Sequence, residues 1–200
     1  MDLLVASSNP GKVREYQTLL AEVPLRLVSL REVGLAEMQV EEDGDTLEAN
    51  ASLKAQAYAR ASSLPALADD TGLFVDALDG APGIYPARYG GPSLTMAQRR
   101  QKLLHELGNT PDAQRTARFV CVIAVAHHDH LETVRGVCEG RIAQVEDGGR
   151  EGFGYDAVFI PQGYAIPWSQ VPVEEKNRIS HRGQAARQII PVLQRLVTSA

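Results

Sequence analysis

The 200-residue sequence lacks several features that would place it outside the ordinary globular class. It has two cysteines, Cys121 and Cys138, and no C-x-x-C pair, which argues against a disulfide framework and against a zinc site. No apolar stretch reaches membrane-spanning length, and the opening MDLLVA is too short for a signal peptide. We therefore expect buried free thiols, a reducing compartment, and a cytoplasmic protein with no membrane partner.

An excess of positive charge is also missing. The chain has 20 Lys and Arg against 25 Asp and Glu, a formal net charge of -5. A broad nucleic-acid surface needs clustered, uncompensated cations, so we expect no nucleic-acid partner. Any polyanion that the protein binds must instead meet local positive charge.

What is present is a regular alternation of apolar strand and helix patterns. Strands are expected at residues 3–6, 25–28 and 64–70, with LFVDAL continuing the last one after a turn at Thr71 and Gly72. Helices are expected from Pro10 and at residues 46–61, 94–107 and 180–197. ARFVCVIAVA and LETVRGVCEGRIAQV predict an antiparallel hairpin joined by HHDH. This order predicts one α/β domain over residues 1–200, built on a mixed sheet.

The segment SSNPGK lies where the first strand passes into the first helix. Free backbone N–H groups and the positive end of the helix dipole favour phosphate at such a junction, and Lys12 adds a charge. The Walker A pattern is absent. The residues alone leave a phosphate loop and a plain helix cap equally open.

Two adjacent carboxylates, Asp69 and Asp70, follow the apolar run LPALA. An unpaired buried carboxylate is costly, so at least one of them needs a partner. Mg²⁺ suits this position because it takes one or two carboxylates and completes its shell with water and phosphate. Glu41 and Glu42 are candidate further ligands, although EEDGD also reads as a solvated acidic turn. Glu48, three residues after Asp45, favours a capping role.

Two later segments are candidates for contact with a base or a phosphate. GFGYD sets Phe153 and Tyr155 among glycines, where the rings either fill the core or form a stacking platform. KNRISHR concentrates cations at the expected start of the last helix, which is unfavourable unless an anion is present. The histidines of HHDH favour an exposed turn over a metal site.

Together these segments resemble the RdgB-like dITP/XTP pyrophosphatase family, which is related to inosine triphosphate pyrophosphatase. The motifs SSNPGKVRE, EEDGDT, ADDTGLFVDALDGAPGIYPARYGG, GFGYDAVF and KNRISHR occur in the family's order and spacing. The resemblance implies a long mixed central sheet flanked by helices in two lobes, with a nucleotide cleft between them. It also implies a homodimer that uses Mg²⁺ to hydrolyse deaminated purine nucleoside triphosphates to the monophosphate and pyrophosphate.

The resemblance assigns a role to each matching residue. Asp70 is implied to activate water and, with Glu41, to bind the metal. The remaining motif residues are implied to bind the substrate: Ser7, Ser8, Asn9, Lys12, Thr71, Phe153, Gly154, Tyr155, Asp156, Lys176, His181 and Arg182. The chain departs from the family pattern at TLEANA, where Ala49 stands in place of the usual glutamate, and at GFGYDA, where Ala157 replaces proline.

Two alternative functions stay open from the sequence. One is a related housekeeping pyrophosphatase acting on other modified nucleotides, which the base pocket would distinguish. The other is a nucleotide sensor without turnover, against which Asp70 argues, since a carboxylate beside phosphates needs a metal between them.

Overall fold

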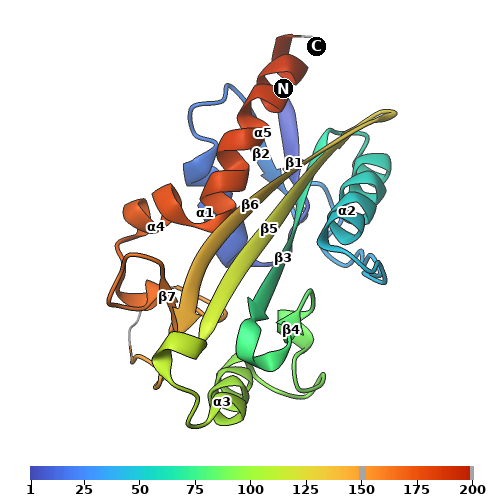
Figure 1. Cartoon of the computed structure of the whole chain (residues 1–200). Coiled ribbons are helices and arrows are strands. Elements are labelled where there is room, and N and C mark those ends of the chain that lie inside the picture. The colour runs from blue at the N-terminus through green and yellow to red at the C-terminus, as the bar shows by residue number, and fades with distance from the viewer. Residues whose placement is uncertain (149–151, 199–200) are drawn as a thin grey trace. The chain divides into compact units, whose positions relative to one another are not determined.

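The structure is a computed structural model of the whole chain, and it describes residues 1–148 and 152–198. Strands and helices alternate along it (Figure 1). The strands are β1 Asp2–Val5, β2 Arg26–Ser29, β3 Ala66–Val75, β4 Pro82–Gly83, β5 Thr116–His127, β6 His130–Ile142 and β7 Phe159–Pro161. The α-helices are α1 Pro10–Leu19, α2 Leu47–Ser62, α3 Met96–Leu107, α4 Val173–Ile179 and α5 His181–Thr198.

The sheet is mixed, as the sequence predicts. Its strand order is β2-β1-β3-β5-β6-β7, with β4 paired to β3. β1 runs parallel to β2 and to β3, whereas β4 is antiparallel to β3 and β7 is antiparallel to β6. β5 and β6 neighbour each other and are joined by the turn at His128 and Asp129, which confirms the expected hairpin.

The chain divides into two compact units, each with its own hydrophobic core. Unit 1 comprises residues 1–70, 121–136 and 181–200, and unit 2 comprises residues 71–120 and 137–180. The core of unit 1 joins β1, α1 and α5 around Leu3, Tyr16 and Ile189. The core of unit 2 joins α3 to the aromatic residues Phe119, Phe159 and Trp168. Both cysteines are buried and free, as expected.

The predicted turn at Thr71 and Gly72 is wrong, because β3 continues without a break from Ala66 to Val75. Gly72 has a different use. A Cβ there would lie 2.7 Å from a ring carbon of Phe74 and 3.0 Å from the carbonyl oxygen of Gly83. The glycine therefore allows β4 to approach β3, and Asp69 and Asp70 lie within the strand instead of at its end.

Two expectations about helix starts also need correction. Thr46, not Asp45, caps α2, since its hydroxyl accepts from the Ala49 N–H at 3.0 Å, and Glu48 lies in the first turn. The segment KNRISHR does not open a single helix. Residues 176–179 end α4, Ser180 separates the helices, and His181 and Arg182 begin α5.

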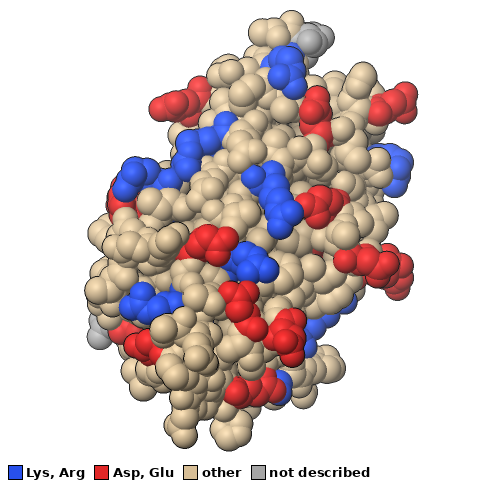
Figure 2. Space-filling view, in the orientation of Figure 1, with Lys and Arg blue, Asp and Glu red and all other residues tan. Residues whose placement is uncertain are grey.

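The described part of the chain contains no helix with the length and apolarity needed to span a bilayer. On the face seen in Figure 2, Lys and Arg are interspersed with Asp and Glu over the whole surface and do not gather into one basic patch.

Candidate functional site

Asp69 and Asp70 send their side chains to opposite faces of β3, because successive residues of a strand alternate. Both lie in the buried middle of the strand, 2% and 7% exposed. Asp69 meets residues of α1 and α5, whereas Asp70 meets a residue of α2. The two adjacent acids therefore belong to two separate charge clusters.

The cluster around Asp69 is neutral overall. Its Oδ2 lies 3.0 Å from the Lys12 ammonium and accepts from Nε and an Nη of Arg182, each at 3.2 Å. The other Nη of Arg182 donates to Glu15 at 2.5 Å. Two cations thus face two carboxylates, and Arg182 itself is only 2% exposed.

These partners keep Asp69 ionised. Burial alone would raise the pKa of Asp69, but the charges of Lys12, Arg182 and Lys54 outweigh burial and hold that pKa well below its usual value. The neighbouring thiol of Cys121 donates to Asp69 at 3.7 Å, and burial together with this carboxylate raises the pKa of Cys121 to about 12. Cys121 is therefore a packing residue and not a nucleophile.

The cluster around Asp70 is acidic. Lys54 on α2 donates to Asp70 Oδ1 at 3.2 Å and to the backbone oxygen of Asp69 at 2.8 Å, and lies 3.4 Å from Glu42. One cation faces two carboxylates here. Burial disfavours the charge of Lys54, but the neighbouring carboxylates outweigh burial and raise the pKa of Lys54. Burial and the charge of Glu42 raise the pKa of Asp70. Within the described ranges, Asp70 Oδ2 is buried without a hydrogen-bond partner.

The acidic segment EEDGD is anchored to α2. Asn50 accepts from the backbone N–H of Gly44 at 2.9 Å, and a Cβ on Gly44 would lie 2.8 Å from the Asn50 oxygen. This attachment holds Glu42 within reach of Lys54. Glu41 is exposed, and along the stretches that the structure describes it makes no ion pair or hydrogen bond.

The segment SSNPGK forms the cap of α1, and the helix begins at Pro10 as expected. Asn9 Oδ1 accepts from the N–H groups of Gly11 and Lys12 at 2.8 and 3.4 Å, and Pro10 opens the helix. Ser7 accepts from the Asn9 N–H at 3.2 Å, and Ser8 is exposed. The cap brings Lys12 to Asp69, so the junction of β1 and α1 is tied to β3 through an ion pair.

Unit 2 holds the second group of predicted residues, arranged around Lys176. Its ammonium lies 2.7 Å from Asp156 Oδ2, 4.9 Å from the Phe153 ring centre and 5.4 Å from that of Trp168. The same Asp156 oxygen accepts from the Phe153 N–H at 2.7 Å. We call Phe153, Asp156, Trp168 and Lys176 the lysine cage.

The glycines and tyrosine of GFGYD support this cage. Gly152 has φ +88°, and a Cβ there would lie 2.3 Å from Asp156 Oδ2. The Gly154 carbonyl accepts from Arg100 at 2.8 Å. Tyr155 is buried in the core, donates to the Pro86 carbonyl at 2.9 Å, and burial raises its pKa to about 12. The two rings therefore differ, since Tyr155 fills the core and Phe153 is half-buried.

The remaining predicted residues lie beside these groups in the sequence. Thr71 follows Asp70 in β3 and is half-buried. His181 is 4% exposed at the first position of α5. Its carbonyl approaches β6 closely, because a Cβ on Gly136 would lie 2.1 Å from it.

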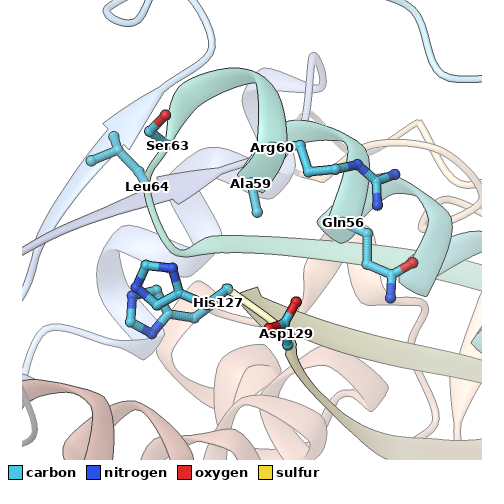
Figure 3. A pocket seen from close by; sticks show the side chains of 8 residues that line it. Gln56, Ala59, Arg60, Ser63, Leu64, His127 and Asp129 are labelled. Atoms are coloured by element: carbon cyan, nitrogen blue, oxygen red, sulfur yellow. The ribbon is translucent and has the colours of Figure 1, made fainter.

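A cavity of about 580 Å³ lies elsewhere in unit 1, between the end of α2 and the β5–β6 turn (Figure 3). Its lining includes Arg60 and Gln56 of α2 with His127, His128 and Asp129. No predicted site residue lines it, and it holds a single carboxylate. The turn at His128 and Asp129 is exposed, which confirms the expectation for the histidines of HHDH. Over the part of the chain that the structure describes, no three His, Cys, Asp or Glu side chains are grouped for a metal.

Sequence reasoning left three contributors without a role: Glu15, Lys54 and Trp168. Lys54 carried a recognisable signal, because it lies four residues from the buried Asn50 and four from the buried Tyr58. A lysine on the buried face of a helix requires an anionic partner. Trp168 carried no such signal, because its contact with Lys176 forms only when the chain folds.

Comparison with known proteins identifies the family. Residues 3–192 match the Ham1 family. The chain belongs to the Ham1 family. Among its relatives, the dITP/XTP pyrophosphatase of Rhodospirillum centenum is 47% identical, with 94% of this chain and 92% of the relative covered. That of Shigella flexneri is 43% identical, with coverage of 96% and 97%.

Solved structures show the same fold. The HAM1 protein from Coxiella burnetii superimposes with a TM-score of 0.86 at 38% identity, covering 98% of this chain and 99% of that one. This Ham1 family member therefore has the expected α/β architecture with a mixed sheet, and the resemblance inferred from the motifs is confirmed.

Proposed function

We propose that this Ham1 family protein is a nucleoside-triphosphate pyrophosphatase that hydrolyses ITP, dITP and XTP or dXTP to the monophosphate and pyrophosphate. The observation that carries the proposal is the separation of Asp69 and Asp70 onto opposite faces of β3. Asp69 is neutralised by two cations, whereas around Asp70 one ammonium faces two carboxylates. The names of the bacterial relatives support the same reaction.

Asp70 is the proposed base for the attacking water. Its Oδ2 has no hydrogen-bond partner among the described residues and is available to accept the proton. Water oxygen bonds to the α-phosphorus, its proton passes to Asp70, and the bond from that phosphorus to the bridging oxygen breaks. Pyrophosphate leaves with the electron pair of the broken bond. Lys12, at the start of α1, is the proposed partner of the phosphates.

The residues around Asp70 fit Mg²⁺. Oxygen ligands and excess negative charge suit this ion, and the cluster has one ammonium for two carboxylates and an unpartnered oxygen on Asp70. We propose that Asp70 and Glu41 hold it, as the resemblance to the family implies. When bound, the ion would neutralise charge developing on the phosphates.

The lysine cage is the proposed base-recognition region. Phe153 offers an aromatic face, and Gly154, Tyr155 and Asp156 shape its surroundings. We propose that Lys176, His181 and Arg182 complete the nucleotide site and that Ser7, Ser8, Asn9 and Thr71 contact the substrate. Arg182 acts in part through Asp69 and Glu15, since both ends of its guanidinium are engaged by them.

We propose that residues 1–200 form one catalytic domain. The resemblance also implies a homodimer, which light scattering at micromolar concentration tests directly.

The deciding experiment measures pyrophosphate release from ITP, dITP, XTP, ATP and GTP, each with and without Mg²⁺. We expect magnesium-dependent release, with the first three substrates ahead of ATP by about a hundredfold or more, because unmatched buried hydrogen-bond groups discriminate strongly. In ¹⁸O-labelled water the label should enter the monophosphate. Label in pyrophosphate, or release of single phosphates, would exclude attack on the α-phosphorus.

A preference for another modified nucleotide with the same label position would instead support a housekeeping pyrophosphatase of different base selectivity. Tight binding of ITP with no product would support a nucleotide sensor.

A further inference from the structure

The only tryptophan of the sequence, Trp168, is buried beside the lysine cage and has no place in the reaction so far described. It lies in a single 3-10 turn, Trp168–Gln170, between β7 and α4. Its indole is 1% exposed and packs against Phe119 and Phe159, with ring centres 5.2 and 4.7 Å apart.

This turn is fixed by polar contacts on both sides. The Ser169 N–H donates to the Asp156 carbonyl at 3.2 Å, and the Ser169 hydroxyl donates to Asp147 at 2.7 Å. Gln170 donates to the other oxygen of Asp147, also at 2.7 Å. The indole therefore has a fixed position relative to Asp156.

Lys176 meets three different groups at once. Asp156 supplies an ion pair at 2.7 Å, and the rings of Phe153 and Trp168 lie 4.9 and 5.4 Å from the ammonium. The negative face of an aromatic ring attracts a cation, most strongly for tryptophan and in a desolvated position. Lys176 is 6% exposed, so this attraction is little weakened by water.

The three groups together restrict the position of the ammonium more than one of them could alone. A lysine is a point charge on a flexible stem, and a single ion pair leaves that stem several rotamers. Asp156 fixes the distance of the ammonium from the GFGYD backbone, because the same oxygen also holds the Phe153 N–H. The indole adds a further contact, 5.4 Å from the ammonium.

We propose that Trp168 is a positioning residue for the substrate, which holds the Lys176 ammonium where a purine base meets Phe153. The inference rests on the proposed function, in which Lys176 and Phe153 contact the nucleotide. Loss of the indole leaves Asp156 paired with Lys176 but widens the range of positions of the ammonium. Binding of the base then weakens, whereas the water-activating group Asp70 is unchanged.

The test compares Trp168→Leu with Trp168→Phe, which keeps a ring but not an indole. Phe119→Leu is the matched control, because Phe119 stacks on Trp168 in the same core, with ring centres 5.2 Å apart. Steady-state kinetics with ITP are measured for each folded variant, alongside the wild type. Trp168→Leu is expected to raise KM by about tenfold with kcat changed less than about threefold.

Trp168→Phe should recover most of that loss, and Phe119→Leu should lower stability without raising KM. Equal KM values for Trp168→Leu and the wild type would overturn the positioning role, as would an equal rise for Phe119→Leu. If Trp168→Leu does not fold, Trp168→Met replaces it as the variant without a ring, and a KM equal to that of the wild type would overturn the positioning role. A wild type that releases no pyrophosphate from ITP would contradict the proposed function itself, which the same assay records separately.

Intrinsic fluorescence gives a second readout, because Trp168 is the single indole. Lys176→Met should change the emission of the ligand-free protein, and ITP should change the emission of the wild type. An emission unaffected by both would contradict the placement of this ring beside the base-binding lysine.

Discussion

In unit 1, Asp69 and Asp70 are surrounded by Lys12, Lys54 and Arg182, whereas in unit 2 a single lysine is held by one carboxylate and two rings. Several charged side chains packed together create a strong local electrostatic field, which suits the binding of phosphates and a metal ion. In unit 2 the half-buried ring of Phe153 lies beside one buried cation and offers an apolar group, which suits a flat heterocycle. The two regions therefore differ in the kind of group that each is suited to contact.

The regions also differ in how their charge is balanced. Around Asp69 two cations meet two carboxylates, so the cluster can be buried without excess charge. Around Asp70 one cation meets two carboxylates. This difference predicts that Asp69 matters chiefly for stability and Asp70 chiefly for turnover.

The largest effect is expected from Asp70→Asn, which keeps the size of the side chain but removes its charge and its ability to take a proton. We expect kcat/KM for ITP to fall by about a thousandfold or more, with unchanged circular dichroism. Asp76→Asn, at a carboxylate with a 52% exposed side chain, serves as control and should retain wild-type activity. Near-normal turnover of folded Asp70→Asn would remove Asp70 from the mechanism.

Asp69→Asn should affect stability instead. Removing this carboxylate leaves Lys12 and Arg182 short of a buried counter-charge, which costs about 3–5 kcal/mol of unfolding free energy. Urea unfolding measures the change. Asp2→Asn breaks an exposed pair with Arg26 and should cost much less. Similar midpoints for the two variants would show that the Asp69 cluster is not a stabilising network.

His181→Ala tests whether this histidine contributes to the selectivity for ITP over ATP. If the buried His181 donates to the 6-oxygen of the base, kcat/KM should fall by about a hundredfold for ITP and by much less for ATP, which offers an amino donor there. His105→Ala, on the outer helix α3, should change neither value. Equal losses on ITP and ATP would mean that His181 does not read the base.

Lys12→Ala should have a smaller effect on catalysis. A point charge at a helix start contributes to phosphate binding together with the backbone, so we expect kcat/KM to fall by about ten- to a hundredfold. Lys102→Ala, at an ion pair on the surface of α3, is the matched control. An unchanged kcat/KM would show that Lys12 is only a structural partner of Asp69 and does not contribute to phosphate binding.

Gly152→Ala should give the smallest change and sharpen the description of unit 2. Gly152 and Gly163 both have positive φ, +88° and +84°, so alanine strains both by about 1 kcal/mol. At Gly152 the added Cβ also displaces Asp156 Oδ2, which is held by Lys176 and Phe153. Unfolding by urea and KM for ITP should therefore change more in Gly152→Ala than in Gly163→Ala, where nothing lies within 4 Å. Equal behaviour would show that the cage tolerates displacement of Asp156.

The sequence by itself determined the elements and the types of group that carry the chemistry. Local signals suffice for these, since Asn9 and Pro10 cap α1 through neighbouring N–H groups and an apolar period fixes which helix face is buried. The paired acids, the lysine of SSNPGK and the aromatic GFGYD segment also stand out by residue type alone.

Only the tertiary structure decided which groups meet. Gly72 reads as a turn in sequence, but the approach of β4 makes it part of a continuous strand, and the alternation of that strand then separates Asp69 from Asp70. Asp69 meets Arg182 across 113 positions of sequence, and Trp168 reaches Lys176 through a fold of the chain. Local patterns carry no information on such pairs, because the energy of a buried ion pair depends on distance in space and on the exclusion of water.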